Sequence, residues 1–558
     1  MWDIEKRRAW AVLAVVIALQ CAVMTYWVGQ KQNLFVDEYY SFGHAHAATL
    51  PNPDFYDFPY NETWVPGTWV DARDLKAFLV VGPNDSVLKD PDSLLFAATK
   101  VRNYYVLLNI VEALLCPGEV GMGVALGLNV VLFAVSQVAL YVVARGLGTS
   151  RWASLLAVLM FGFSSMAISH VTYVRFYVWV SLCMLVVVLL HERMWEGRSL
   201  PRFLLMEVVS FVLLYASARN SEFVMVVGGV LVVGFGVVLI AGRRLREAAC
   251  YLVPSLGGGL WYVFNKTSVL DLFMHPEHYL GEGWPRGTMA YCLANFSVDD
   301  TIYRMLWSIR RVVDQLLGHI FIAYALVALA VVMAVMALVG RAKAPAHMAP
   351  KGSEKVGQAE TDGADSAPTW PLAIVLVCAA VANFGFVALT GITINRYIML
   401  SFPLVAAVMW LALDRLAEKA GHVRALAAVL AVVTVAGAVV PSAIGGFEYL
   451  YPKDSVLRQT LQDYQDTDVV MVYDEQAYAG TEVYDCIGLC GEDVRVYPME
   501  YGNPHIDAST CPDELLLWVK RDADPSVAAA DLVEAGYTLE LVGNDHASTV
   551  YVARRASS

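Results

Sequence analysis

Long apolar runs separated by short polar segments dominate the chain. Runs of the ~17–25 apolar residues that cross a bilayer fall near 9–28, 121–144, 152–170, 177–191, 203–218, 223–241, 249–264, 319–339, 370–389, 398–413 and 424–441. Charged residues make up only 16% of the 558 residues, whereas a soluble domain has about 25%. The pattern therefore predicts an α-helical polytopic membrane protein with about 11 transmembrane helices.

Basic residues between the predicted spans indicate the orientation of the chain. They cluster on one side of the predicted membrane, at 6–8, 145–151, 193–202, 243–246, 341–343 and 415–419. Short loops rich in Lys and Arg stay cytoplasmic. We therefore expect a multi-pass protein of the cell (plasma) membrane with its N-terminus in the cytoplasm. A large first loop, 29–120, a second loop, 265–318, and the C-terminal tail would then lie outside.

Two stretches break the apolar pattern after the first loop. Residues 342–369, inside the predicted transmembrane domain 1–441, are rich in Ala, Gly, Pro and Ser and are expected to form a flexible cytoplasmic linker loop. Residues 454–558 alternate the strand-like runs VVMVY, VRVYP, ELLLWVK, TLELVG and TVYVAR with the helical run PSVAAADLVEAG. This alternation predicts a small extracytoplasmic α/β domain at the C-terminus.

The tail also carries the excess negative charge. From Lys453 onward there are 20 acidic and 7 basic residues, which accounts for the whole net charge of −13. No basic stripe is present, so a nucleic-acid partner is not expected. Outside the cell, Cys486, Cys490 and Cys511 could form one disulfide, and the sequence leaves the pairing open. A zinc site at these cysteines is disfavoured, because no histidine lies at ligand spacing.

The segment 33–47, NLFVDEYYSFGHAHA, carries the first candidate chemistry. Asp37 and Glu38 come directly after the first span, where the chain leaves the membrane. Arg175, Arg219 and Arg396 lie where other spans meet the same side. One such arginine alone is best explained as an anchor that reaches up to water. Three of them beside an acidic pair indicate a site for a lipid phosphate, because guanidinium groups bind phosphate in bidentate fashion.

Helical spacing distinguishes the two acids of this segment. If 37–47 is a helix, Asp37, Ser41 and His44 share one face, whereas Glu38 points about 100° away. Only one acid should then reach a reacting hydroxyl. The alternative is that Asp37 merely caps an interfacial helix. Glu38 is either a second catalytic group or the ion-pair partner of an arginine.

Three short motifs in this order resemble the GT-C superfamily of membrane glycosyltransferases. They are VDEYYSF after the first span, YVRFY between the third and fourth, and NRYIMLSFPL opening a late span. The resemblance is to the branch that includes protein O-mannosyltransferases and lipid A aminoarabinose transferases. It implies a polyprenyl-phosphate sugar as donor and transfer on the outer side of the membrane. It also implies that Asp37 is the general base and that Arg175 and Arg396 bind the donor phosphate.

The chain departs from the pattern of this family at two places. KVRNYY, 100–105, stands where many relatives have a His-Pro-Pro-Leu-Tyr-Tyr-like stretch, and Arg219-Asn220-Ser221 stands where many have Thr-His-Tyr. Arg102 and Arg219 could replace the missing groups as phosphate ligands. The departures leave open which sugar is transferred and whether the acceptor is a cell-envelope glycan, a lipid or a protein.

The remaining candidate residues surround these motifs. Tyr173, His170, Tyr397 and His44 are candidate substrate contacts. His44 and His46 are two residues apart, which is not the spacing of a helical metal-ligand pair. No cofactor is therefore expected, and a divalent metal ion is not favoured. The main alternative function is a flippase or transporter of lipid-linked glycans, which would favour ionisable residues near mid-membrane and internal repeats. The sequence shows neither feature.

The one-sided distribution of Lys and Arg predicts that the tail 454–558 is exposed outside the cell. Protease added to intact cells should therefore remove it, as followed with an antibody to a C-terminal tag. A cytoplasmic tag at the N-terminus should survive the same treatment. Cleavage of the tail only after lysis would show that the orientation is reversed.

Overall fold

The computed structural model describes residues 2–49, 66–82, 84–197, 199–265, 297–318, 324, 327–328, 331–332, 335, 370–390, 394–420, 423–445, 447–473, 481–501, 505–521 and 523–556. Contacts within the chain divide it into two compact units. The helical unit comprises Met1–Val23, Val131–His170 and Tyr177–Gly446. The mixed unit comprises Met24–Val130, Val171–Phe176 and Phe447–Ser558. The predicted domain bounds, 1–441 and 454–558, stay a prediction, and the predicted linker 342–369 lies outside the described residues.

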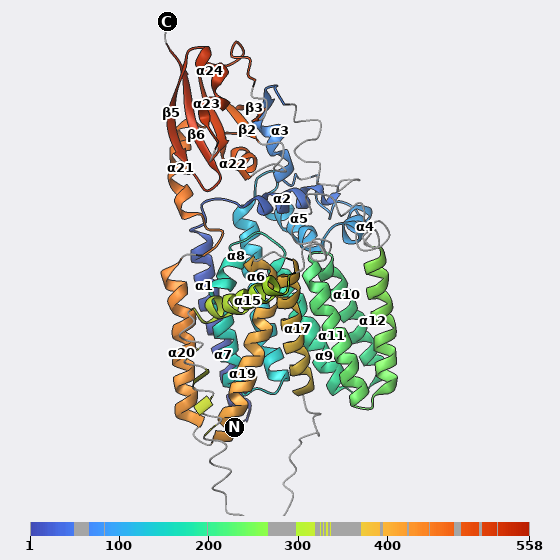
Figure 1. Ribbon diagram of the computed structural model, residues 1–558. Coiled ribbons are helices and arrows are strands. Elements are labelled where there is room, and N and C mark those ends of the chain that lie inside the picture. Colours follow the sequence, from blue (N-terminus) through green and yellow to red (C-terminus); the bar gives the residue numbers. More distant parts are fainter. Residues whose placement is uncertain are drawn as a thin grey trace, which may run out of the picture. The chain divides into compact units, whose positions relative to one another are not determined.

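Long apolar helices make up the helical unit (Figure 1). In chain order the helices are α1 (Trp2–Val28) and α6 (Met122–Gly146), which also reach into the mixed unit, then α7 (Arg151–Gly162), α8 (Ser165–Val171), α9 (Tyr177–Glu196), α10 (Leu200–Ala218), α11 (Glu222–Ala241), α12 (Leu245–Asn265), α15 (Val298–Leu317), α17 (Trp370–Thr390), α18 (Asn395–Ile398), α19 (Ser401–Ala420) and α20 (Val423–Ile444).

Six helices within the described residues are long and apolar enough to cross a membrane. They are Glu5–Val28, Met122–Gly146, Tyr177–Glu196, Leu200–Ala218, Phe223–Ala241 and Trp370–Leu389. The successive helices α7 and α8 meet at 58° and would make a seventh span if they form one broken crossing. The membrane character of the chain agrees with the prediction, but the predicted number of spans is not reached.

The other predicted spans fall into two groups. Those at 249–264, 398–413 and 424–441 coincide with helices α12, α19 and α20, which are not among these six. In α19 the reason is visible, because Asp414, Arg415, Glu418 and Lys419 fill its last turns. Most of the predicted span 319–339 lies outside the described residues. A total of eleven spans therefore stays a prediction.

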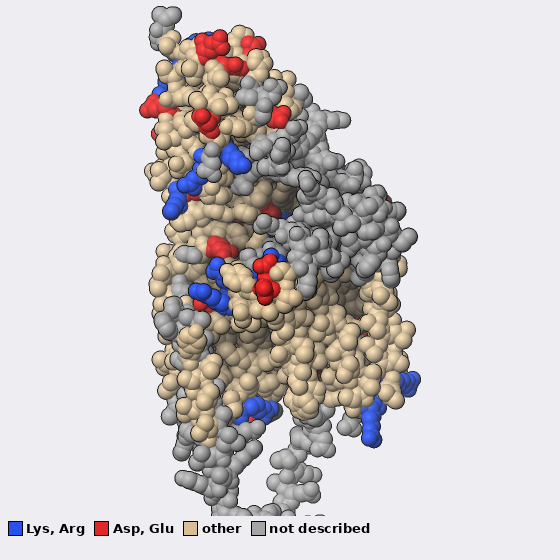
Figure 2. Space-filling model, viewed as in Figure 1, with Lys and Arg blue, Asp and Glu red and all other residues tan. Residues whose placement is uncertain are grey.

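Small residues bring neighbouring helices of the helical unit close together. Helix α11 packs against α10, α12 and α17, and α19 packs against α17 and α7. A Cβ at Gly234 of α11 would come within 2.7 Å of Val375 on α17, so this contact requires glycine. The outer surfaces of these helices expose apolar side chains such as Leu205, Val237 and Val253, and Figure 2 shows this surface as almost uninterrupted tan. Such a surface suits contact with lipid.

A six-stranded mixed sheet forms the core of the mixed unit, in the order β1-β3-β2-β4-β6-β5. Its strands are β1 (Val70–Asp71), β2 (Val469–Tyr473), β3 (Arg495–Glu500), β4 (Glu514–Lys520), β5 (Tyr537–Asn544) and β6 (Ser548–Arg555). Strand β2 runs parallel to β3 and β4, whereas β6 is antiparallel to β4 and β5. All five strand-like runs of the tail are confirmed as strands. The predicted helical run forms two short helices, α23 (Pro525–Ala528) and α24 (Ala530–Glu534).

The first loop contributes to the same unit as the tail. Its short strand β1 pairs with β3, and its helices are α2 (Val36–His46), α3 (Ala72–Lys76), α4 (Pro91–Lys100) and α5 (Asn103–Leu115). Helix α2 packs on α22 (Thr481–Leu489) of the tail. There Tyr39 stacks on Tyr484 with ring centroids 5.6 Å apart, and a Cβ at Gly488 would collide with the Tyr39 ring. The helix that carries the acidic pair is therefore anchored to the tail.

The cysteines of the tail do not form a disulfide in the structure. Cys486, Cys490 and Cys511 are all buried free thiols. A free thiol behaves as a small apolar side chain, so these cysteines can fill buried apolar positions without forming a disulfide.

Candidate functional site

Helix α2 starts where the sequence analysis expected a helix and presents the expected face. It spans Val36–His46, and extended Phe35 precedes it as the N-cap residue. The carboxylate of Glu38 accepts the Phe35 N–H at 2.8 Å, which satisfies one of the free donors at the helix start. Asp37 is thus not the capping residue, and the interpretation of Asp37 as a simple helix cap is wrong. Its carboxylate remains available for other contacts.

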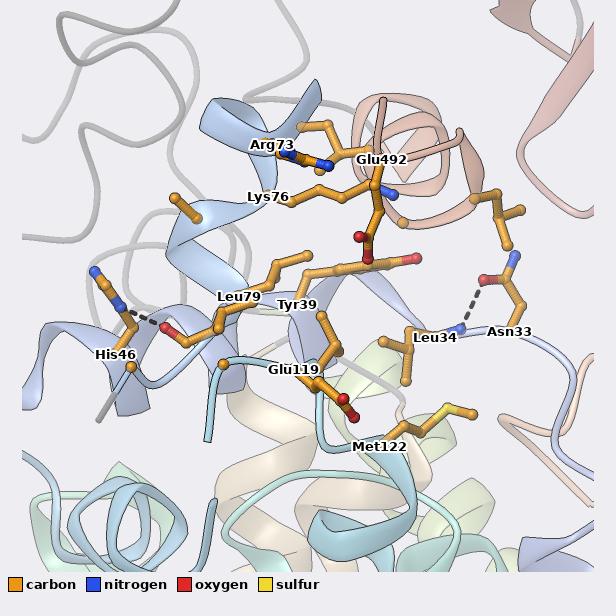
Figure 3. Close-up of a pocket in the computed structure, with 18 of the residues that line it drawn as sticks. Asn33, Leu34, Tyr39, His46, Arg73, Lys76, Leu79, Glu119, Met122 and Glu492 are labelled. Atoms are coloured by element: carbon orange, nitrogen blue, oxygen red, sulfur yellow. Dashed lines mark hydrogen bonds between the residues drawn. The ribbon is translucent and has the colours of Figure 1, made fainter. Parts of the chain in front are cut away.

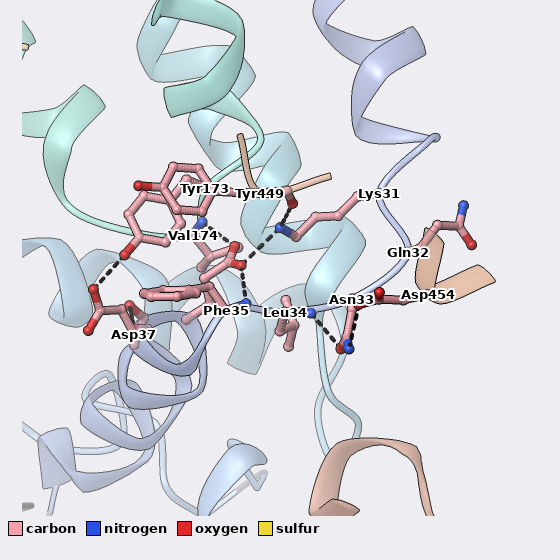
Figure 4. A network of polar contacts seen from close by, with 12 residues as sticks. Lys31, Gln32, Asn33, Leu34, Phe35, Asp37, Tyr173, Val174, Tyr449 and Asp454 are labelled. Atoms are coloured by element: carbon pink, nitrogen blue, oxygen red, sulfur yellow. Dashed lines mark hydrogen bonds and ion pairs between the residues drawn. The ribbon is translucent and has the colours of Figure 1, made fainter. Parts of the chain in front are cut away.

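Asp37 lies between a tyrosine and an arginine from the loop 171–176. The Tyr173 hydroxyl donates a hydrogen bond of 2.6 Å to Asp37 Oδ2, and Arg175 Nη2 lies 3.5 Å from Asp37 Oδ1 (Figure 4 shows Asp37 and Tyr173). The side chains of Asp37 and Arg175 keep 17% and 13% of their surface exposed. A carboxylate and a guanidinium are therefore held side by side and can still be reached from outside.

Arg175 is fixed on its other side by residues of α2 and α5. Its Nη1 donates to the Tyr105 hydroxyl at 2.7 Å and lies 3.4 Å from Ser41 Oγ. The His44 ring stacks on Tyr105 with centroids 4.8 Å apart. The predicted common face of Asp37, Ser41 and His44 is therefore confirmed, and it faces the guanidinium.

Glu38 points away from this face and is completely buried. Its carboxylate lies 2.9 Å from Lys31 Nζ, with neither side chain exposed, and it also accepts the Val174 N–H at 2.7 Å. Lys31 donates in turn to the Tyr449 carbonyl at 2.5 Å. Burial raises the pKa of Glu38 and lowers that of Lys31, while their mutual attraction opposes both shifts. The expected arginine partner of Glu38 is thus replaced by a lysine.

The position of Glu38 assigns it a role different from that of Asp37. A carboxylate with no exposed surface cannot contact a substrate hydroxyl. Its bond to the Val174 N–H instead holds the loop 171–176 against α2, so that Tyr173 and Arg175 flank Asp37. Sequence reasoning missed Lys31, although it is the only Lys or Arg in 29–49 and lies a few residues before Asp37 and Glu38.

Further polar groups support the loop 171–176 from inside the mixed unit. Asn129 Nδ2 donates to the carbonyls of Tyr173 and Val171, at 2.8 and 3.3 Å. The Tyr104 hydroxyl donates to Asn129 Oδ1 at 3.1 Å. The Tyr173 ring stacks on Tyr449 at a centroid distance of 4.0 Å. These contacts restrict the conformations of the Tyr173 side chain. They therefore also fix the geometry of its hydrogen bond to Asp37.

Four of the predicted site residues belong to the helical unit, where they form a group of their own. Arg219 follows the end of α10, and Arg396 lies in α18 with its guanidinium 5.3 Å from the Tyr397 ring centre. Tyr397 stacks on Phe223, at the start of α11, with centroids 4.4 Å apart. His170 lies within electrostatic range of Arg396. Their predicted roles as substrate ligands stay predictions.

The predicted residues are thus distributed over both units. The mixed unit brings together Asp37, Glu38, Tyr173, Arg175, His44 and Arg102. Arg102 precedes α5, and its positive charge acts on His44 together with that of Arg175. The helical unit holds Arg219, Arg396, Tyr397 and His170.

A large cavity of about 950 Å³ opens within the mixed unit, and no pattern of residues predicted it. Tyr39 and His46 of α2 line it together with Arg73, Lys76 and Glu492 (Figure 3). Tyr39 is two positions after Asp37, which on a helix places the two side chains about 200° apart. The cavity therefore lies on the other side of α2 from the carboxylate of Asp37. Both cationic and apolar side chains, including Leu34, Leu79 and Met122, face it.

Comparison with known proteins gives structural neighbours only. No protein-family model and no curated protein matches the sequence. Among solved structures, two crystal structures of ArnT from Cupriavidus metallidurans resemble the chain. One is in the apo state, with a TM-score of 0.48 and 12% identity over 98% of both chains. The other is bound to undecaprenyl phosphate, with a TM-score of 0.46 and 12% identity over 97% of this chain and 98% of that one.

An oligosaccharyltransferase from Archaeoglobus fulgidus, crystallised with Zn and sulfate, is also similar. Its TM-score is 0.41 with 11% identity, over 88% of this chain and 62% of that one. All three structures have TM-scores below 0.5 and at most 12% identity to this chain. The geometry around Asp37 is independent of these likenesses.

The burial of His44 predicts a pH-dependent stability. Burial, assisted by the charges of Arg175 and Arg102, lowers the pKa of His44 to about 3. The unfolded chain binds a proton near pH 6.5, so the contribution of this group to stability is complete above that pH. It is lost as the pH falls from 6.5 toward 3, by up to ~1.4 kcal/mol per unit. His44→Gln should therefore reduce the fall in Tm between pH 7.5 and 5.

Thermal unfolding of the purified chain in detergent, measured at several pH values, tests this dependence. His505→Gln serves as the matched control, because the His505 side chain is 81% exposed. The His505 variant should keep the pH slope of the wild type. Identical slopes in the His44 variant and the wild type would contradict the neutral, buried state of His44.

Proposed function

We propose that this chain is a membrane glycosyltransferase that moves a sugar from a polyprenyl-phosphate donor to an acceptor hydroxyl on the extracytoplasmic side. The observation that carries the proposal is the pair formed by Asp37 and Arg175, whose charged groups lie 3.5 Å apart and remain partly exposed. A proton acceptor and a phosphate ligand at one place are the two groups that this reaction needs.

The reaction follows from the chemistry of the two groups. The acceptor hydroxyl loses its proton to Asp37 as its oxygen forms a bond to the anomeric carbon of the sugar. The bond between that carbon and the phosphate oxygen breaks, and the polyprenyl phosphate leaves with the electron pair. Arg175 stabilises the negative charge of the leaving phosphate. Asp37 is then the general base and Arg175 a donor-phosphate ligand, and the step as written uses no cofactor.

The neighbours of this pair prepare it for the reaction. Tyr173 donates to one carboxylate oxygen of Asp37 and thereby orients the other toward Arg175. Tyr105 holds the guanidinium in place. Glu38 acts through the loop that it fixes and is a positioning residue in this proposal. Tyr173 and His44 are the substrate contacts that we propose in the mixed unit.

The rest of the chain serves the two substrates. The apolar helices would keep the prenyl chain of the donor in the lipid, and Arg102, Arg219 and Arg396 remain further candidates for its phosphate. His170 and Tyr397 remain candidate substrate contacts. The large cavity beside α2, with its apolar and cationic walls, has the volume for a polar group with an apolar part. The proposal is compatible with three kinds of acceptor: a cell-envelope glycan, a lipid or a protein.

Asp37→Asn tests the general base most directly. Asparagine keeps the size and hydrogen bonding of the side chain but cannot accept the proton, so the rate should fall 10²–10⁴-fold. The measurement is turnover in proteoliposomes supplied with undecaprenyl-phosphate sugars and a mixture of cell-envelope acceptors. Donor binding and Tm should stay close to those of the wild type.

Glu38→Gln is the comparison that separates chemistry from structure. It removes one partner of a fully buried ion pair, which costs about 3–5 kcal/mol, so its main effect should be a lower Tm. The activity that remains per folded molecule should exceed that of Asp37→Asn. An Asp37→Asn protein with the wild-type rate would refute the proposed base. Donor transport across the liposome membrane without sugar transfer would instead favour a flippase.

The arginines predict a specific loss of donor binding. Removal of one charge-assisted contact to a phosphate costs about 1.5–3 kcal/mol, which corresponds to roughly 10- to 150-fold in affinity. Arg175→Ala and Arg396→Ala should each weaken binding of a polyprenyl phosphate by this amount, as measured by competition with a labelled donor. Arg145→Ala is the control, because Arg145 lies on the predicted cytoplasmic side and donates to the Thr149 carbonyl just after α6. Donor affinity unchanged in Arg396→Ala would remove Arg396 from the site.

A further inference from the structure

Two aspartates and a histidine meet at the edge of the tail sheet, away from the residues of the proposed reaction. Asp454 ends the short 3₁₀ turn Pro452–Asp454, and Asp545 and His546 lie in the connection between β5 and β6. Each of the three offers one ligand atom, and these atoms all lie within 4.8 Å of one another. His546 and Asp454 are 92 positions apart in the chain, so the sequence spacing does not suggest the group.

The group contains buried acceptor atoms that no donor satisfies. Asp454 and Asp545 are each only 3% exposed. Asp545 Oδ1 accepts the N–H groups of Ala547 and Ser548, at 2.8 and 2.6 Å. Its other oxygen, Oδ2, is buried and has no hydrogen-bond partner among the described residues, and the same holds for His546 Nε2. An unsatisfied buried carboxylate oxygen is costly and therefore calls for an explanation.

A histidine–aspartate ion pair by itself leaves this cost in place. His546 Nδ1 lies 2.7 Å from Asp454 Oδ2, so a protonated imidazole would neutralise one carboxylate. The second carboxylate, Asp545, would still be buried beside the first. Two carboxylates that are both buried and lie this close together repel each other. A doubly charged cation bound to both carboxylates would remove the repulsion.

We propose that Asp454, Asp545 and His546 bind a divalent transition-metal ion, Zn²⁺ or Mn²⁺, that braces the segment preceding Asp37. Two carboxylates and one imidazole form a mixed oxygen and nitrogen donor set. This set suits Zn²⁺ or Mn²⁺ better than Mg²⁺ or Ca²⁺, which prefer oxygen ligands alone. Three protein ligands leave at least one position for water. Tyr451, stacked on the His546 ring with centroids 4.1 Å apart, covers the imidazole.

Hydrogen bonds connect the proposed metal site to the segment before α2. Asn33 Nδ2 lies 3.3 Å from Asp454 Oδ2 and 3.2 Å from Asp485 Oδ1, and Figure 4 shows Asn33 directed at Asp454. Its own Oδ1 accepts the Leu34 N–H at 2.8 Å. Asn33 lies between Lys31 and Asp37 in the sequence. A metal ion that fixes Asp454 therefore also fixes the segment 31–35, as hydrogen-bonded neighbours of metal ligands do.

Metal binding can be measured on the full-length chain in detergent, after treatment with EDTA and removal of the chelator. ZnCl₂, MnCl₂ or MgCl₂ is added, excess metal is removed, and the bound metal is determined by mass spectrometry. We expect one Zn²⁺ or Mn²⁺ per chain, a higher Tm in its presence, and little retention of Mg²⁺. Hydrogen exchange of residues 31–38 should slow when Zn²⁺ is added.

Variants of the ligands identify the site. Asp545→Asn and His546→Gln should each weaken Zn²⁺ binding at least about tenfold, since even the loss of a neighbour of a metal ligand costs 10–100-fold. His505→Gln is the matched control, because His505 Nδ1 also lies 2.9 Å from an aspartate, Asp531, but the His505 side chain is 81% exposed and the pair is not part of a three-ligand group among the described residues. This control should bind Zn²⁺ as the wild type does.

The Asp545→Asn protein should fold without metal, because the substitution replaces a buried charge by a neutral group of the same size. The His546→Gln protein provides a second, independent test of metal binding. Less than one-fifth of an ion retained per wild-type chain, in a test with each of the three salts, would overturn the proposal. Zn²⁺ affinities that are equal in Asp545→Asn, His546→Gln and His505→Gln would overturn it as well, because the metal would then be bound elsewhere.

Discussion

The buried ion pair between Lys31 and Glu38 holds together the part of the molecule that carries the candidate site. Neither side chain has any exposed surface. Lys31 also binds the Tyr449 carbonyl, and Glu38 also binds the N–H groups of Phe35 and Val174. One pair of opposite charges thus joins three segments that are far apart in the chain: the exit from α1, the loop 171–176 and the start of the tail. Loss of either partner would leave an uncompensated buried charge, which is why the pair cannot be changed one side at a time.

This constraint explains why two adjacent acids behave so differently. On α2, consecutive residues point about 100° apart, so the fixing of Glu38 in the interior turns Asp37 toward the partly open side. There Asp37 meets Tyr173 and Arg175, which the same ion pair holds through Val174. The buried acid therefore determines the geometry, and Asp37 keeps 17% of its side-chain surface exposed beside Tyr173 and Arg175. Preorganised charges of this kind need no rearrangement when a substrate arrives.

The first loop and the tail form one folded unit, and this has consequences for the site. Strand β1 extends the tail sheet, α2 packs on α22, and Asn33 contacts Asp454 and Asp485. The segment before Asp37 therefore lies against the tail and not free in solvent. Changes in the tail near Asp454 can therefore be transmitted to the segment 31–35 through a few hydrogen bonds.

The sequence by itself determined those features that depend on local periodicity. Apolar runs fixed the membrane helices, alternation of apolar and polar residues fixed the strands of the tail, and the 3.6-residue period fixed the face shared by Asp37, Ser41 and His44. The tertiary structure alone decided which partner each charged group meets: Lys31 instead of an arginine at Glu38, Tyr105 at Arg175, and Asp545 beside Asp454. Tyr105 and Arg175 are 70 positions apart in the chain, and Asp454 and Asp545 are 91 positions apart. Their pairing depends on how whole segments pack, and a local pattern of residues carries no information about it.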